Sequence, residues 1–196
     1  FFFTPHPANP DSSTSRGLGD VYKRQTLDGM NATAFPSGVM TMPIEATEHT
    51  GPIIIWKKEL RPDSGGAGKF RGGLGQFITI GAYEGYEFDV SLMFDRVHNP
   101  PLGRKGGLPG GATIVIKDDG SKMRGKGIQF VEEGRVIEMS LPGGAGYGPP
   151  KDRLRALVLR DVILGYVSIK NAKEHFDLTI SEIIEIETAI RTGIII

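Results

Sequence analysis

Three glycine-dense segments constrain this chain more than any other feature of its sequence. Residues 61–75 contain six glycines in fifteen positions, residues 95–111 include the runs PPLG and GGLPGG, and residues 142–150 read PGGAGYGPP. Glycine adopts positive φ and lets another backbone approach closely, so such segments between strand-like runs indicate shaped connections. The 28 glycines and 13 prolines follow no fixed period, which excludes a collagen-like repeat.

Charge and cysteine content limit the possible partners. The 23 Lys and Arg residues balance the 23 Asp and Glu residues, so no net field attracts nucleic acid or an anionic membrane. No apolar run approaches the roughly 20 residues that a membrane helix needs. The absence of cysteine excludes a disulfide framework and a thiol nucleophile. We therefore expect a cytoplasmic protein with neither nucleic acid nor membrane as partner.

Residues 1–25 are predicted to be a non-native or disordered tail. They begin with three Phe, continue into a polar stretch rich in Pro and Ser, and show neither helical nor alternating periodicity. The string SSTSRGLGDVYKRQ resembles adapter-derived translation at the ends of metagenomic reading frames, which has no place in reasoning about the fold. A signal peptide is the competing interpretation, but three Phe are too few for its apolar region.

Residues 26–150 are predicted to form a β body. In residues 87–94 the apolar side chains alternate strictly with polar ones, which predicts a strand with one buried face. The segment 84–86 before it is short enough for a hairpin, and Pro43 favours an extended edge segment over residues 39–49. About seven strands at such spacing are typical of an antiparallel sandwich or barrel. The other predicted strands are residues 53–60, 76–82, 112–117 and 135–141.

At Pro150 the apolar period becomes helical. Residues 151–164 are predicted to be a helix that ends at Gly165. Ser168 is a candidate cap for a second helix, and Thr179 with Glu182 has the spacing of a capping box before a third. The expected fold is therefore mainly β within the α+β class. Residues 151–196 form a helical appendix of the same domain.

The glycine segments also carry a family resemblance. The chain resembles the C-terminal part of the hydantoinase B/oxoprolinase family over roughly residues 31–191. The family's last glycine run is usually four successive glycines followed by Tyr-Gly-Asp-Pro, whereas here Ala145 interrupts it and Pro149 replaces the Asp. The family's subunit is also much longer, so we expect a fragment. The likeness rests on residues 43–48, 66–75, 95–110 and 142–150, and continues through Arg153, Val158, Asp161, Val162, Gly165 and Ala172.

The resemblance implies an ATP-dependent hydrolase that opens a lactam or imide ring, such as 5-oxoproline or a hydantoin. An actin-like hydantoinase A/oxoprolinase partner is expected to bind ATP and Mg²⁺, and this fragment is expected to bind no cofactor itself. Two alternatives stay open: a subunit of an acetone or acetophenone carboxylase, and a non-catalytic scaffold that contacts other subunits.

Four side chains are candidates for catalysis. Arg71 is flanked by glycines, so its guanidinium has access to a phosphate or carboxylate, although it is equally suited to an ion pair with a neighbouring loop. Asp95 and Arg96 end the clearest strand, where site residues often lie, or else they pair to hold the loop that follows. His98 follows them and is the candidate titrating group.

Four glycines beside these side chains are candidates for binding substrate or phosphate: Gly72, Gly73, Gly106 and Gly107. Glu45, Glu48 and His49 form an acid-rich run, but Glu45 and Glu48 point to opposite faces of an extended segment, so no metal site is expected. Residues 143–148 match no nucleotide-binding motif and are predicted to be a tight structural loop.

Overall fold

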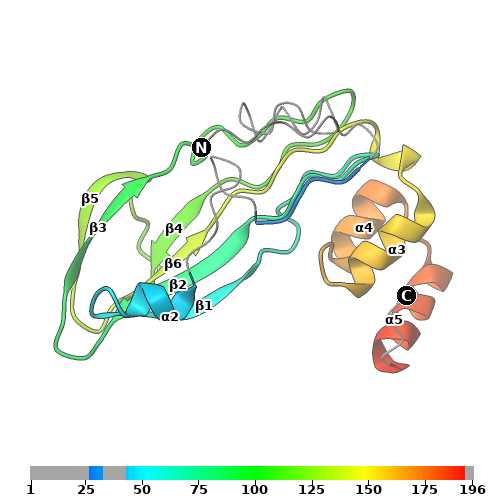
Figure 1. Ribbon diagram of the computed structural model, residues 1–196. Coiled ribbons are helices and arrows are strands. Elements are labelled where there is room, and N and C mark those ends of the chain that lie inside the picture. Colours follow the sequence, from blue (N-terminus) through cyan, green and yellow to red (C-terminus); the bar gives the residue numbers. More distant parts are fainter. Residues whose placement is uncertain (1–26, 33–42, 193–196) are drawn as a thin grey trace, which may run out of the picture.

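The structure is a computed structural model in which residues 27–32 and 43–192 are described. The predicted tail and residues 39–42 of the predicted edge segment lie outside this part. Figure 1 shows the strands and the short helix α2 at one end, the helices α3, α4 and α5 at the other, and long extended segments between them. The elements are α2 (Ile44–Glu48), β1 (Ile53–Leu60), β2 (Gln76–Ala82), β3 (Phe88–Met93), β4 (Ile114–Lys117), β5 (Lys126–Val131), β6 (Val136–Ser140), the 3-10 turn η1 (Pro150–Asp152), α3 (Arg155–Ile163), α4 (Ile169–Phe176) and α5 (Ile180–Thr192).

The strands form two antiparallel sheets that pack face to face. One sheet has the order β1-β2-β6-β4, and the other is the pair β3-β5. Leu92 and Val131 of the smaller sheet pack against Ile137, Met139 and Val115 of the larger one, and all five side chains are buried. The mainly β, sandwich-like body and its C-terminal helices are thus confirmed.

Strand pairing differs from the prediction at the segment 84–86. The predicted hairpin between β2 and β3 is wrong, because β2 pairs with β1 on one edge and β6 on the other. β3 crosses to the second sheet and pairs with β5, with Phe88 opposite Val131. The alternation that identified β3 placed its apolar face correctly, but periodicity does not show which strand is the neighbour.

The predicted edge segment is also wrong where the structure describes it, because residues 44–48 form helix α2. Pro43 immediately precedes this helix, and its carbonyl accepts hydrogen bonds from the N–H and Oγ1 of Thr47, both within 3.1 Å. Proline is tolerated at a helix start because the first N–H groups have no partner within the helix. Its presence therefore marked the beginning of a helix rather than a strand edge.

The glycine segments form a layer that we call the glycine core, made of residues 64–75, 101–111 and 141–148. Its segments run side by side from the sheets to the helices, with residues 28–32 beside them (Figure 1). Backbone hydrogen bonds join all three: Gly66 N–H donates to Gly144 O at 2.8 Å, and Gly146 N–H donates to Leu108 O at 2.9 Å. The loops are therefore packed and not slack.

Glycine is required in this core because the backbones nearly touch. A Cβ on Gly72 would lie 2.1 Å from Gly144 O, and one on Gly107 would lie 2.2 Å from Gly146 O. Both distances are far below van der Waals contact, and the atoms they meet are main-chain atoms that cannot rotate away. Any side chain at these positions would force the segments apart.

The helices pack on one end of the glycine core. Ala67 of the core contacts a buried cluster that includes Val158 and Val162 of α3 and Ile183 and Ile186 of α5. The predicted first helix is four residues too long at its start: residues 150–152 form η1, and α3 begins only at Arg155.

The predicted helix ends are confirmed. Gly165 has φ +71° just after α3, and Ser168 Oγ accepts the N–H of Asn171 at the start of α4. Thr179 N–H donates to Glu182 Oε2 at 2.9 Å at the start of α5. Within the described residues, no helix combines the length and the apolar character needed to cross a membrane.

Gly72→Ala should destabilise the chain strongly, because the added methyl group would meet the carbonyl of Gly144. We expect a loss of about 3 kcal/mol or more in the free energy of unfolding, measured by urea denaturation. Gly51→Ala is the matched control, since nothing lies within 4 Å of its Cβ position; its change should stay within about 1 kcal/mol. Equal effects of the two substitutions would contradict this account of the core.

Glu182 should titrate far below the ordinary value of 4.5. It accepts hydrogen bonds from the Arg155 guanidinium and from Thr179, and these bonds lower its pKa to about 2. Because the pKa is lower in the folded state, the stability that this contact gives is full above pH 4.5 and lost as pH falls toward 2. Carboxyl NMR should show a titration midpoint near 2. In Arg155→Met the midpoint should return toward 4.5, and an unchanged midpoint would rule out the pairing.

Candidate functional site at the junction of the glycine core and the helices

A buried cluster of charged side chains joins the glycine core to α3. Arg153 donates to both oxygens of Asp28, with Nη1 to Oδ1 at 2.6 Å and Nη2 to Oδ2 at 2.8 Å, and its Nη2 also reaches Asp161 Oδ2 at 2.6 Å. Arg71 Nε donates to the same Asp161 oxygen at 3.1 Å. The side chains of Arg71, Arg153 and Asp161 are at most 3% exposed. We call these four residues the Arg–Asp cluster.

Local backbone geometry explains how the cluster forms. Arg153 lies between η1 and α3 with an extended ψ of 134°, and this break in the helical segment precedes α3. Asp161 follows eight residues later, on the side of α3 that is buried. Asp28 comes from the segment that lies along the core, where its Oδ1 also accepts the Arg71 N–H at 2.8 Å. The cluster therefore fastens three distant parts of the chain.

For Asp28 and Arg153, charge pairing shifts the pKa more than burial does. Burial by itself raises the pKa of the Asp28 carboxyl, but the hydrogen bonds and positive charge of Arg153, with those of Arg71, hold that pKa below its ordinary value. Burial disfavours the charged form of Arg153, yet the Asp28 and Asp161 carboxylates raise the pKa of its guanidinium. Asp28 and Arg153 thus favour their charged forms, as buried charges do when they are paired.

A cavity of about 210 Å³ opens beside this cluster, between the glycine core and α4. Its polar lining consists of Arg71 and Asp63 from the first glycine segment and Asn171 and His175 from α4. Asn171 and His175 are four residues apart, so they lie on one face of the helix. Buried Arg71 thus takes part in both the cluster and the cavity wall.

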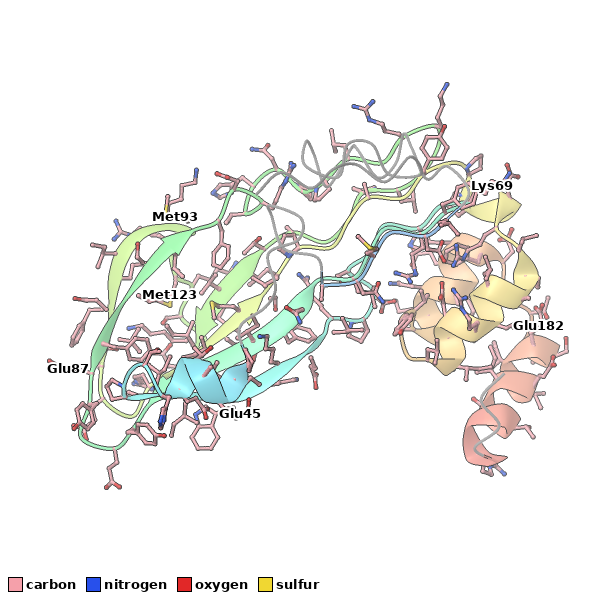
Figure 2. The ribbon with its side chains drawn as sticks, in the orientation of Figure 1. Glu45, Lys69, Glu87, Met93, Met123 and Glu182 are labelled. Atoms are coloured by element: carbon pink, nitrogen blue, oxygen red, sulfur yellow. The ribbon has the colours of Figure 1, made fainter. Side chains whose placement is uncertain are left out.

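The predicted catalytic residues do not form one group. Arg71 lies in the buried cluster, whereas Asp95, Arg96 and His98 are exposed on the loop after β3. Asp95 pairs with Lys126 at 2.5 Å, and this hydrogen bond and charge lower the pKa of its carboxyl. Figure 2 shows Met93, two residues before Asp95, at the opposite end of the molecule from Lys69.

The predicted binding glycines serve the packing of the core. Gly72 and Gly73 are buried, and a Cβ on Gly73 would lie 2.0 Å from Met30 O. Gly107 packs on Gly146, while Gly106 is exposed with φ +88° in the turn between two passes of the core. The missing side chains of Gly72, Gly73 and Gly107 therefore make room for other backbones, whereas at Gly106 the positive φ favours glycine.

Most N–H groups of residues 143–148 donate to carbonyls within the glycine core. Within residues 143–148, the N–H groups of Gly144, Gly146 and Gly148 donate to Gly73, Leu108 and Arg104 carbonyls. A phosphate cradle needs such groups to be free. Among the described residues, no three His, Asp or Glu side chains gather as a metal site would require. Glu48 of α2 instead accepts the N–H of Ile55 at 2.8 Å.

Sequence reasoning did not assign a role to three members of the cluster. Arg153 and Asp161 belonged to the stretches that carry the family resemblance, so a signal for them existed. The contact between Arg153 and Asp161 was missed because the sequence predicted one continuous helix from residue 151. In the structure Arg153 is extended and precedes α3, and this conformation lets it reach Asp161 eight residues later. Asp28 had no sequence signal, since its partners lie at least 43 residues away.

Comparison with known proteins shows the family. The hydantoinase B/oxoprolinase family matches residues 15–150 of this chain, and the chain belongs to this family. An uncharacterized protein of Methanocaldococcus jannaschii is 39% identical over 145 residues, which cover 72% of this chain and 25% of that protein. The caprolactamase subunit beta of Pseudomonas jessenii is 30% identical over 156 residues, which cover 72% of this chain and 26% of that subunit.

Solved structures agree in fold. The crystal structure of the ATP-dependent caprolactamase from Pseudomonas jessenii matches with a TM-score of 0.68 and 28% identity, over 80% of this chain and 29% of that one. A nucleotide-free acetone carboxylase matches with a TM-score of 0.64 over 85% of this chain and 29% of that one, but at 19% identity this likeness shows the fold alone. The chain spans about a quarter of the length of the two curated relatives described above.

Arg153→Met should be severely destabilising, because it leaves Asp28 without its bidentate partner in a buried setting. We expect a loss of about 3–5 kcal/mol in the free energy of unfolding, measured by urea denaturation at neutral pH. Arg135→Met, which breaks an exposed pair with Asp118, is the control and should cost less than about 1 kcal/mol. A loss at Arg153 no larger than that of the control would mean that the cluster does not fasten the helices.

Proposed function

We propose that this chain is the C-terminal part of the B subunit or domain of an ATP-dependent hydrolase that opens a lactam or imide ring. The observation that carries this proposal is the likeness to the ATP-dependent caprolactamase, which combines 28% identity with a TM-score of 0.68 over 80% of this chain. The relative named caprolactamase subunit beta supports the same assignment. Candidate substrates are cyclic amides such as 5-oxoproline or a hydantoin, and the proposed location is the cytoplasm.

The proposed reaction needs ATP because an unstrained cyclic amide is stabilised by resonance. Water adds to the ring carbonyl carbon and the ring C–N bond breaks, which yields a carboxylate and an amine, while ATP is cleaved to ADP and phosphate. Negative charge develops on the carbonyl oxygen during this step, so oriented hydrogen-bond donors must face it. ATP supplies the driving force that makes the carbonyl carbon reactive.

We place ATP and Mg²⁺ on an actin-like partner of the hydantoinase A/oxoprolinase type. Four of the six N–H groups of residues 143–148 donate to carbonyls of the glycine core, which leaves few donors in this segment for phosphate oxygens. One relative is named caprolactamase subunit beta, and this name supports the presence of a second, different subunit. In this arrangement, the present chain would help to shape the substrate site and would contact the other parts of the complex.

A non-catalytic scaffold is the second candidate function, and the Arg–Asp cluster favours it. Arg71, the candidate catalytic residue that lies within the glycine core, pairs with Asp161 in the interior. Asp95, Arg96 and His98 remain candidates on the exposed loop, where another part of a longer protein could complete a site. The two functions differ in what substitution of Asp95 should do.

The test uses the full-length B component mixed with its actin-like partner, ATP and Mg²⁺. We expect ring opening of 5-oxoproline, a hydantoin or caprolactam, detected as the amino-acid product by mass spectrometry, together with ADP release. Omission of ATP should abolish the product. If the complex instead forms a carboxylated product from acetone and bicarbonate, the proposed hydrolase activity is wrong and the chain belongs to a carboxylase.

Asp95→Asn separates catalysis from scaffolding. If the exposed loop takes part in the reaction, turnover per intact complex should fall by at least tenfold while the complex stays assembled, as seen by analytical ultracentrifugation. If the chain is a scaffold, turnover per intact complex stays unchanged. Asp118→Asn, at an exposed carboxylate that pairs with Arg135, is the control.

A further inference from the structure

The cavity between the glycine core and α4 has one wall that carries a buried positive charge. Arg71 lines this cavity with a side chain that is 3% exposed. Its Nε donates to Asp161, and its Nη1 donates to Gly72 O at 2.7 Å. Its third nitrogen, Nη2, has no hydrogen-bond partner among the described residues. This nitrogen is therefore available to a ligand that supplies an acceptor.

The opposite wall of the cavity comes from α4. Asn171 offers an amide that both donates and accepts, and His175 offers an imidazole. Ser168 fixes the start of this helix through its bond to the Asn171 N–H, so the two side chains are held on a rigid element. The cavity is therefore polar on two sides and has donors that are already in place.

The remainder of the lining is apolar, and the space is small. Ala67, Leu108, Val167 and Phe176 line the rest. At 210 Å³ the cavity is smaller than the roughly 300–1,000 Å³ typical of sites for drug-sized ligands. It thus suits a small molecule with an apolar body and one acceptor group.

The charges around the cavity select the type of acceptor. Arg160 also pairs with both aspartates of the Arg–Asp cluster, at 3.4 Å from Asp28 and 3.6 Å from Asp161. Three guanidinium groups therefore face two carboxylates, which leaves a net positive charge beside the cavity. Asp63 also lines the cavity, and its carboxylate accepts the Ser168 N–H at 2.8 Å. A doubly charged phosphate would be repelled by Asp63, whereas a single carboxylate needs only one charge-assisted hydrogen bond.

We propose that this cavity binds a small monocarboxylate with an apolar body. The carboxylate accepts from Arg71 Nη2, the apolar body packs against Leu108 and Phe176, and Asn171 and His175 close the polar side. This binding is a property of the chain itself, and it stands or falls independently of ring hydrolysis.

The test is titration of the ¹⁵N-labelled chain with sodium butyrate, followed by NMR. We expect saturable shifts at the amides of Gly66, Ala67, Asn171 and His175. The dissociation constant should be about 1–10 mM, in keeping with a ligand of so few atoms. Butylamine, which has a similar apolar body and the opposite charge, should cause no saturable shifts there. Inorganic phosphate should bind at least tenfold more weakly than butyrate.

Two variants test the residues. Arg71→Gln keeps an amide beside Gly72 O and leaves Asp161 paired with Arg153, and it should weaken butyrate binding at least tenfold. Asn171→Leu leaves Arg71 intact but fills the cavity, so it should also weaken binding at least tenfold. Arg135→Gln, at an exposed pair, should change nothing.

The proposal is overturned by any of three results. The first is the absence of saturable butyrate shifts at these amides, and the second is tighter binding of phosphate than of butyrate. The third is unchanged butyrate affinity in Asn171→Leu when its spectrum shows a folded chain. The Asn171→Leu result decides the matter even if Arg71→Gln fails to fold.

Discussion

Close contact between main chains in the glycine core is the constraint on which the rest of this structure depends. Three segments approach until a carbonyl oxygen occupies the place of a side chain, as Gly144 O does beside Gly72. Such a layer buries little apolar surface, so its cohesion comes from backbone hydrogen bonds instead of side-chain packing. The sandwich at one end and the helices at the other supply the hydrophobic cores that the layer lacks.

Features that depend on neighbouring residues could be predicted from the sequence, and features that depend on distant ones could not. The inward face of β3, the glycine after α3 and the cap at Ser168 follow from local periodicity and stereochemistry. The pairing of β3 with β5 does not follow from local periodicity, because the order of strands in a sheet depends on which strand edges are already occupied. The helix at residues 44–48 was missed because Pro43 suits a helix start as well as a sheet edge.

The candidate site shows the same division. Arg71 was singled out for its glycine neighbours, and both of its suggested roles have structural counterparts: it pairs with Asp161 and it lines a cavity. Its burial and the contribution of α4 to that cavity depend on tertiary contacts. His175, which the sequence analysis did not single out, lies in the cavity wall. A carboxylate is also a product of opening any cyclic amide, so the two proposals are chemically compatible although neither requires the other.

The bidentate contact between Asp28 and Arg153 spans 125 residues of sequence. Closing so long a loop costs conformational entropy before any contact repays it, and proteins rich in such contacts fold slowly. During synthesis, the segment around Asp28 leaves the ribosome long before its partner exists. Its contact with the Arg71 N–H can form 43 residues later, whereas the bidentate contact can form only after Arg153 has been made.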